Sequence, residues 1–245
     1  AYKNDNGSQF IKNSANPVTR KYWTCSRQSA SAAILHGHER RPTFVVSNAF
    51  LIDKDHSMLD VVKNRKIDLY TWATPNGRKV SIMLEELALP YRVIPVDITR
   101  DQQHAPEFLA ISPNNKIPAI VDHDEGAQLM ESGAILMYLA SKSGRLMSSA
   151  GPLHWQQLEW LMFQMGSLGP MLGQTHHFVK FNAGKSVYAE DRYRAENRRL
   201  YKVLDARLEG RQFICGEYSV ADIAAWPWIS RFEWQEMDLR EFPHL

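Results

Sequence analysis

The turn Thr74-Pro75-Asn76-Gly77 carries the first side chains whose types and spacing could do chemistry. It lies between a run of β-forming residues and a run with helical periodicity, so it should mark the N-terminus of a helix. That end of a helix has partial positive charge and free backbone N–H groups, which favour an anion such as a thiolate and lower its pKa. The Thr74 hydroxyl and the Asn76 amide can each donate a hydrogen bond to the sulfur. The alternative is that both side chains only cap the helix.

A proline that opens a short strand is the second feature. If the Ile117-Pro118 bond takes the cis form, which is the minority isomer of X–Pro bonds, the backbone of Ile117 turns outward. Its N–H and C=O groups could then pair with an extended peptide ligand. An ordinary trans proline at the start of an edge strand is the alternative, and the sequence leaves both open.

Two further pairs of side chains have the charges to bind the ends of a small peptide. Glu131 and Ser132 begin a predicted helix, where backbone N–H groups and the Ser132 hydroxyl suit a carboxylate and Glu131 suits an ammonium. Lys116 and Gln103 lie on loops near the same strand ends, and they could bind a second carboxylate. Helix capping by the first pair and a solvated lysine in the second are the commoner roles.

The four features together ask for one ligand with a thiolate, a peptide backbone, an amino group and two carboxylates. Glutathione has all of these groups. The sequence therefore predicts glutathione as a cosubstrate, with no metal.

The elements that must position these residues alternate between strands and helices, which favours a parallel strand pair joined by a helical crossover. The predicted elements are, in chain order, a strand over 67–72, a helix to about residue 88, a strand over 91–96, a short helix over 106–110, strands over 119–121 and 128–130, and a helix over 131–141. The last two strands are so close in the chain that they must be antiparallel. The order β-α-β-α-β-β-α is that of a thioredoxin-like half.

After Gly151-Pro152 the apolar residues recur only at helical spacing. A long helix is expected from about residue 187, and the capping box formed by Ser219 and Asp222 opens another. Pro227 should kink or end that helix, and the two tryptophans beside it, Trp226 and Trp228, should belong to the core. The sequence therefore predicts an all-helical second domain.

Composition bounds the remaining choices for this chain of 245 residues. The basic segment 1–66 is expected to be a disordered or unrelated leader, 67–146 an α/β domain and 150–245 a helical domain. No apolar run approaches the roughly 20 residues of a membrane helix.

The two cysteines lie in different segments, which excludes a disulfide framework or a cysteine zinc site and indicates reduced, intracellular thiols. Cys215 is expected to be structural, the pair His176-His177 to lie in a loop or pocket wall, and the pair His36 and His38 not to bind metal.

Several long motifs from Ile67 to the last residue resemble glutathione transferases, and within them the Nu class of bacterial and fungal disulfide-bond reductases. These motifs are I-D-L-Y-T-W-A-T-P-N-G-R-K-V, I-S-P-N-N-K-I-P-A-I-V-D, E-S-G-A-I-L-M-Y-L-A, L-G-P-M-L-G-Q and S-V-A-D-I-A-A-W-P-W. The resemblance implies an N-terminal thioredoxin-like domain that binds glutathione, a helical C-terminal domain, and a cytoplasmic homodimer. It also implies that residues 1–66 have no counterpart in the family and that the helical domain stops short of the family's end.

The resemblance assigns roles at matching positions. Thr74 and Asn76 would contact the glutathione sulfur, Pro118 would be cis, and Arg192 would reach the glutathione of a partner subunit. The tripeptide would be bound by Gln103, Lys116, Ile117, Glu131 and Ser132. Without the resemblance, Arg192 would be read as an exposed helix arginine.

The activity expected from these residues is thiol–disulfide exchange by the thiolate of bound glutathione on a small disulfide. Two alternatives remain open: conjugation of glutathione to an electrophile or reduction of a peroxide, and a non-catalytic module that binds glutathione for regulation. No nucleic-acid or membrane partner is expected.

Overall fold

A computed structural model describes residues 66–245 of the chain. The expectations for residues 1–66, including those for His36 and His38, lie outside the described residues except at Lys66. No helix among the described residues is both long enough and apolar enough to span a membrane.

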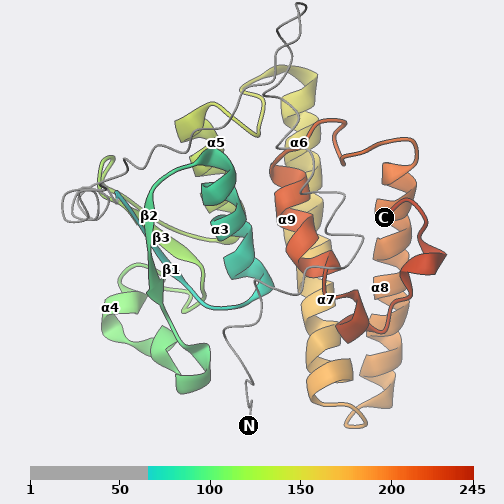
Figure 1. The fold of residues 1–245 in the computed structure, drawn as a ribbon. Helices are drawn as coiled ribbons and strands as arrows, with labels where there is room; N and C mark the ends of the chain where they lie inside the picture. Colours follow the sequence, from blue (N-terminus) through green and yellow to red (C-terminus); the bar gives the residue numbers. More distant parts are fainter. Residues whose placement is uncertain (1–65) are drawn as a thin grey trace, which may run out of the picture. The chain divides into compact units, whose positions relative to one another are not determined.

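The first part of the described chain is built on a four-stranded mixed sheet with the order β2-β1-β3-β4 (Figure 1). Its strands are β1 (Ile67–Thr71), β2 (Tyr91–Pro95), β3 (Ala119–Asp122) and β4 (Ala127–Met130). β1 pairs with β2 in parallel and with β3 antiparallel, and β3 pairs antiparallel with β4. The predicted parallel pair and the predicted antiparallel pair are both confirmed.

The two faces of this sheet are covered by different helices because successive residues of a strand point to opposite sides. Leu69 and Ile120 face a core shared with α3 (Pro75–Leu87) and α5 (Ser132–Ser143). Their chain neighbours Tyr70 and Ala119 face a smaller cluster that includes Phe108 of α4 (Pro106–Leu109). Two short 3₁₀ turns, η2 (Ile98–Arg100) and η3 (Gln102–His104), precede α4. This is the thioredoxin-like arrangement that the sequence predicts.

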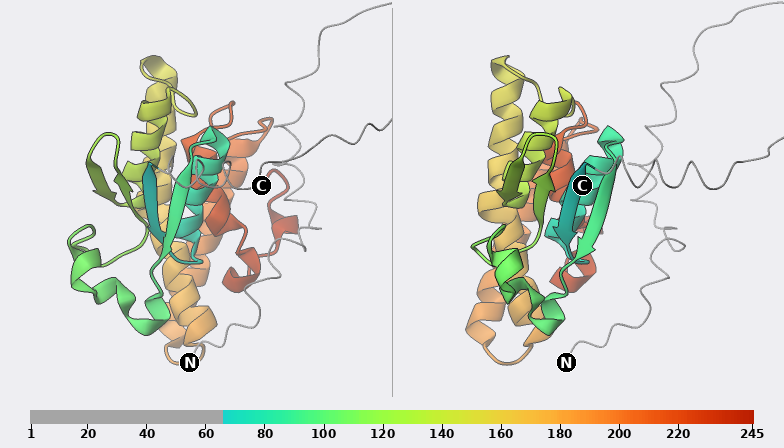
Figure 2. Two further views of the ribbon diagram at one scale, coloured as in Figure 1. Left: turned by 60° about the vertical axis from the view of Figure 1, so that its left-hand side comes forward. Right: turned by 90° about the vertical axis from the view of Figure 1, so that its left-hand side faces the viewer.

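The rest of the described chain is helical, as predicted. One long helical column consists of α6 (Gly151–Phe163), the π-turn η4 (Gln164–Leu168), α7 (Gly169–Thr175) and the π-turn η5 (His176–Phe181) (Figure 2). It is followed by α8 (Val187–Leu208), α9 (Val220–Ile229) and the short turns η6 (Phe232–Gln235) and η7 (Leu239–Glu241). α9 packs against both α6 and α3, so it connects the helical part to the α/β part.

The predicted capping box at the start of α9 is present. The Ser219 backbone N–H donates to the Asp222 carboxylate at 3.0 Å, and Ala221 N–H donates to the Ser219 hydroxyl. Burial raises the pKa of Asp222 to about 6. Pro227 lies inside α9, which continues two residues beyond it.

Candidate functional site

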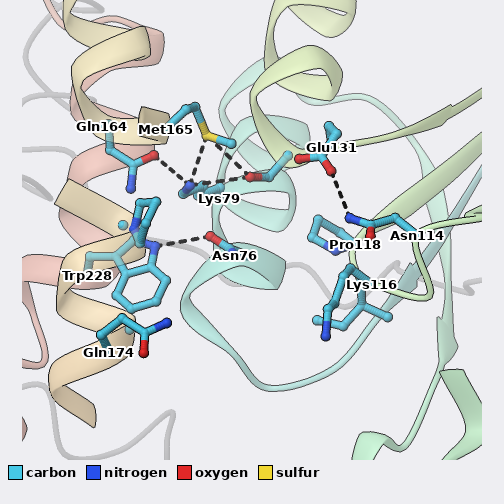
Figure 3. A pocket seen from close by; sticks show the side chains of 15 residues that line it. Asn76, Lys79, Asn114, Lys116, Pro118, Glu131, Gln164, Met165, Gln174 and Trp228 are labelled. Atoms are coloured by element: carbon cyan, nitrogen blue, oxygen red, sulfur yellow. Dashed lines mark hydrogen bonds between the residues drawn. The ribbon is translucent and has the colours of Figure 1, made fainter. Parts of the chain in front are cut away.

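A cavity of about 510 Å³ lies between the α/β part and the helical part (Figure 3). Six of the nine side chains that the sequence proposed line it together: Asn76, Lys116, Ile117, Pro118, Glu131 and Ser132. They come from the start of α3, the loop before β3 and the start of α5. The opposite wall comes from η4, α7 and α9.

Thr74 holds the start of α3 in place. It is the N-cap of the helix, and its hydroxyl oxygen accepts a hydrogen bond from Gly77 N–H at 3.2 Å. That bond uses an oxygen lone pair and leaves the hydroxyl hydrogen free to donate. Capping and donation to a sulfur are therefore compatible, and Thr74 can do both.

Gly77 allows the turn to close tightly under the helix. A Cβ at this position would lie 2.4 Å from Thr71 Oγ1 and 2.5 Å from the Trp72 carbonyl oxygen. The first turn of α3 can keep its place only if residue 77 has no side chain.

Gly77→Ala is therefore expected to lower the free energy of unfolding by about 2 kcal/mol, because backbone must move to admit the methyl group. Chemical denaturation measures this loss. The matched control is Gly166→Ala in η4, where the added methyl group meets no atom within 4 Å. Equal stability of the two variants would contradict the assigned role of Gly77.

Asn76 is oriented by a tryptophan from the helical part. The indole Nε1–H of Trp228 donates to Asn76 Oδ1 at 3.0 Å (Figure 3). Trp228 is buried, as the sequence predicted, but it also has a polar contact at the site that sequence reasoning missed. No local pattern signals this contact, because 152 positions separate the two residues.

The loop before β3 lines the cavity with Asn114, Lys116, Ile117 and Pro118. The Ile117-Pro118 peptide bond is cis, as the resemblance implied. The Ser112 hydroxyl, which is buried, donates to the Lys116 carbonyl oxygen at 2.8 Å and holds the loop from beneath.

The start of α5 has an unusual backbone at Glu131. Its φ is 68° and its ψ is 111°, a region that non-glycine residues rarely adopt and that costs about 1–3 kcal/mol. The Glu131 carboxylate accepts a hydrogen bond from Asn114 Nδ2 at 3.4 Å. This bond joins the start of α5 to the loop before β3. Strain of this kind concentrates at binding and catalytic sites, which favours a functional role for Glu131 over capping.

Lys79 is a functional candidate that the sequence reasoning missed. Its ammonium is buried, and it donates to Gln164 Oε1 at 2.6 Å, to Ser132 Oγ at 3.3 Å and to Met165 Sδ at 3.4 Å. Burial lowers the pKa of Lys79 from 10.5 to about 7, while the nearby Glu131 carboxylate opposes the shift. The sequence did carry a signal that Lys79 is buried. Lys79 lies four positions before Met83, and residues at this spacing share one face of a helix, here the buried face of α3.

The helical wall of the cavity is formed partly by a π-turn, a feature that is frequent at functional sites. Gln164 of η4 is buried, and its Nε2 has no hydrogen-bond partner among the described residues. Gly169, Gly173 and Gln174 of α7 complete this wall.

Three of the nine proposed residues lie outside the cavity lining of a single chain: Thr74, which caps α3 beside the lining residue Asn76, Gln103 and Arg192. Gln103 is on η3, where its Nε2 approaches Asp101 Oδ1 at 3.4 Å. Arg192 is exposed on α8. Their proposed roles remain predictions.

The two adjacent histidines and Cys215 lie outside the cavity lining. His176 and His177 lie in η5, not in a loop, and neither lines the cavity, so the expectation of a loop or pocket wall is wrong. His176 is buried beneath Trp228, and burial lowers its pKa to about 4. Burial raises the pKa of Cys215 to about 11, which suits a structural cysteine. Among residues 66–245, no group of three or more His, Cys, Asp or Glu side chains is placed to hold a metal ion.

Known proteins resemble this chain in sequence and in fold. Residues 69–146 match the family model for the N-terminal domain of glutathione S-transferases. The chain is 51% identical over 183 residues to the disulfide-bond oxidoreductase YfcG of Escherichia coli strain K12, which covers 72% of this chain and 85% of the relative.

Solved structures of bacterial glutathione transferases are similar as well. One from Pseudomonas putida, with one glutathione disulfide bound per subunit, is 46% identical with a TM-score of 0.67, over 76% of this chain and 85% of that one. One from Pseudomonas fluorescens Pf-5, with two glutathione molecules bound, is 46% identical with a TM-score of 0.69, over 74% and 85% of the two chains.

Proposed function

Because this chain belongs to the glutathione S-transferase family, we propose that it is a glutathione-dependent thiol–disulfide oxidoreductase. The observation that carries the proposal is the cavity itself. It brings the donor-bearing start of α3 together with the cis-proline loop and the strained start of α5. The similar relative named as a disulfide-bond oxidoreductase supports the reaction class.

In this proposal each part of glutathione meets groups of matching chemistry. The sulfur lies at the start of α3, where Thr74 and Asn76 donate to it and the helix end favours the thiolate. The backbone of Ile117, exposed by the cis bond to Pro118, pairs with the peptide. Glu131 takes the ligand ammonium and Ser132 one carboxylate.

The second carboxylate of glutathione is assigned to cationic and polar groups of the loops. Lys116 lines the cavity beside Ile117 and supplies a positive charge. Gln103 lies on η3, outside the cavity lining, and its side chain would have to reach the ligand from there. Both assignments are part of the proposal.

The exchange takes place in two balanced steps. The glutathione thiolate attacks one sulfur of the substrate disulfide, the S–S bond breaks, and the departing thiolate takes a proton from water. A second glutathione thiolate then attacks the glutathione sulfur of the mixed disulfide, which releases the second substrate thiol and glutathione disulfide. Two glutathione molecules are oxidised and one disulfide is reduced. Relatives crystallised with glutathione disulfide or two glutathiones support a site of this capacity.

The nucleophile in this scheme belongs to the ligand, so the chain's own thiols should be dispensable. Replacing Cys25 and Cys215 together with alanine is expected to leave the rate of glutathione-dependent disulfide reduction within about twofold of the original. Steady-state kinetics with glutathione and bis(2-hydroxyethyl) disulfide measure the rate. A loss of tenfold or more with the fold intact would mean that a protein thiol takes part.

The reaction class is tested by offering the protein three acceptors with glutathione: a small disulfide, an aryl halide and a hydroperoxide. The proposal expects the highest kcat/KM with the disulfide. Faster conjugation or peroxide reduction would favour the alternative transferase activity. Retention on immobilised glutathione without turnover of any acceptor would favour a regulatory binding module.

We also propose that two copies form a dimer. Trp155 and Met162 are 66% and 47% exposed on α6, two helical turns apart, and exposed apolar side chains of this size favour a protein partner. Arg192 would then reach the glutathione of the partner subunit. Sedimentation analysis should give twice the mass of one chain, and a monomer would contradict the proposal.

The proposal also assigns a role to each of two domains. Residues 67–146 would act as the glutathione-binding domain, and residues 150–245 as the helical domain that closes the acceptor side. Because the exchange consumes reduced glutathione, which the cytosol maintains, we propose the cytoplasm as its place of action.

A further inference from the structure

We propose that Trp228 is a positioning residue for the sulfur site: its indole N–H holds the Asn76 amide so that the NH₂ group, and not the oxygen, faces the ligand sulfur. The inference rests on the proposed function, because it assigns the orientation of a group that the reaction uses. It adds a residue of the helical part to the machinery that lowers the thiol pKa.

The orientation matters because the two ends of an amide have opposite chemistry. Asn76 Nδ2 donates hydrogen bonds, which stabilises a thiolate, whereas Oδ1 only accepts and would repel it. An indole N–H can only donate, so the atom that faces Trp228 Nε1 at 3.0 Å must be Oδ1. With Oδ1 bound to the indole, Nδ2 is the polar atom that Asn76 has left for the cavity that it lines.

The indole that holds Asn76 is itself tightly packed. Trp228 is 8% exposed, and its ring stacks on the His176 imidazole with centroids 5.6 Å apart and an angle of 25°. On another side it meets Gly173, where an added Cβ would lie 3.3 Å from Trp228 Cη2. Because Gly173 has no side chain, the indole ring of Trp228 can pack closely against it.

The backbone of Trp228 is also fixed. Gln235 Nε2 donates to the Trp228 carbonyl oxygen at 2.9 Å, and Gln235 Oε1 accepts from the Tyr201 hydroxyl. Gln235 and Tyr201 are both fully buried. The core of the helical part thus holds Trp228, and Trp228 holds Asn76 at the start of α3.

A pH profile separates positioning from general support of the fold. Without the indole N–H the Asn76 amide can rotate, the thiolate loses its oriented donor, and the pKa of the bound thiol rises. Trp228→Phe is therefore expected to lower kcat/KM about tenfold at neutral pH and to move the acidic limb of the profile up by about one pH unit. At alkaline pH, where the thiol is ionised in both proteins, the difference should disappear.

The decisive measurement is an ultraviolet titration of the thiolate of bound glutathione, which needs no acceptor. It compares the original protein, Trp228→Phe, Asn76→Ala and the double variant, with Trp226→Phe as the control from the same helix outside the cavity lining. The inference expects a higher thiol pKa in Trp228→Phe, none of this shift in Trp226→Phe, and no further change when Trp228→Phe is added to Asn76→Ala.

Two results would overturn the inference: an unchanged thiol pKa in Trp228→Phe, or an equal additional shift in the Asn76→Ala background. If Trp228→Phe fails to fold, benzothienylalanine at position 228 replaces it, because this residue keeps the ring outline and lacks only the N–H. Failure of the proposed function is recognised separately. In that case the original protein reduces no disulfide, while the titration still decides the role of Trp228.

Discussion

Thr74→Asp is expected to lose about 100-fold in kcat/KM for glutathione-dependent disulfide reduction while the protein stays as stable as the original. Thr74 caps α3 by accepting from Gly77 N–H, and an aspartate oxygen accepts that bond at least as well. Aspartate has no hydroxyl hydrogen to give to the sulfur, and its negative charge opposes a thiolate at the same place. Losing one oriented donor to a developing or fixed anion costs on the order of 100-fold.

Two companion variants separate the cap from the donor. Thr74→Ser keeps both functions, so its rate and its melting temperature should stay close to those of the original protein. Thr74→Ala removes both, and it should lose activity together with about 1 kcal/mol of stability. Thermal denaturation and steady-state kinetics on all three variants give the answer. Full activity in Thr74→Asp would reduce Thr74 to a helix cap, and the sulfur would then need another donor.

Lys79→Met is expected to weaken glutathione binding by about 10- to 100-fold at pH 6. The Lys79 ammonium donates to Ser132 Oγ at 3.3 Å, and in the proposed complex that hydroxyl would bind a ligand carboxylate, which the nearby positive charge would stabilise. Hydrogen bonds to charged groups contribute about 1.5–3 kcal/mol, which corresponds to this range of affinity. Isothermal titration with glutathione measures the effect.

The same variant should lose a pH dependence. Burial lowers the pKa of Lys79 to about 7, so the ligand-free protein releases this proton near neutrality. A bound carboxylate favours the ammonium and raises that pKa, so binding takes up a proton and affinity should fall as the pH rises through 7. Lys79→Met cannot show this fall.

Stability should respond to pH with the opposite sign. Between about pH 7 and 10.5 the unfolded chain keeps the Lys79 proton that the folded protein has released. The unfolded state then binds more protons, so the contribution of Lys79 to the free energy of unfolding rises with pH across this window. Lys142→Met, which removes a lysine of α5 that pairs with Asp122 of β3 and does not line the cavity, is the matched control. Equal binding effects in the two lysine variants would contradict the role of Lys79.

Much of the fold could be read from local pattern. The turn at 74–77 combines an N-cap, a proline and a glycine between two periodic segments, and the predicted helix is present, although α3 already begins within the turn, at Pro75. The capping box at 219–222 was equally plain. Pro227 was harder to judge, because a proline ends a helix only where the missing hydrogen bond cannot be tolerated, and α9 continues past it to Ile229.

The thioredoxin-like half of the site was also accessible from the sequence. Asn76, Ile117 and Ser132 each stand at the end of an element, and the ends of neighbouring elements meet at one edge of a sheet. Turn chemistry and strand order were therefore sufficient to predict that these residues gather. The charges of Glu131 and Lys116 then indicated the kind of ligand.

The sequence by itself determined the polar groups at the start of α3, the loop around Pro118 and the ligand chemistry that they suit, because each depends on residues close together in the chain. Tertiary structure alone decided the partners of those groups across the cavity. Trp228 meets Asn76, and Gln164 meets Lys79, over separations of 152 and 85 positions. Contacts of this kind depend on how α9 and η4 pack against α3, and no local spacing encodes that packing.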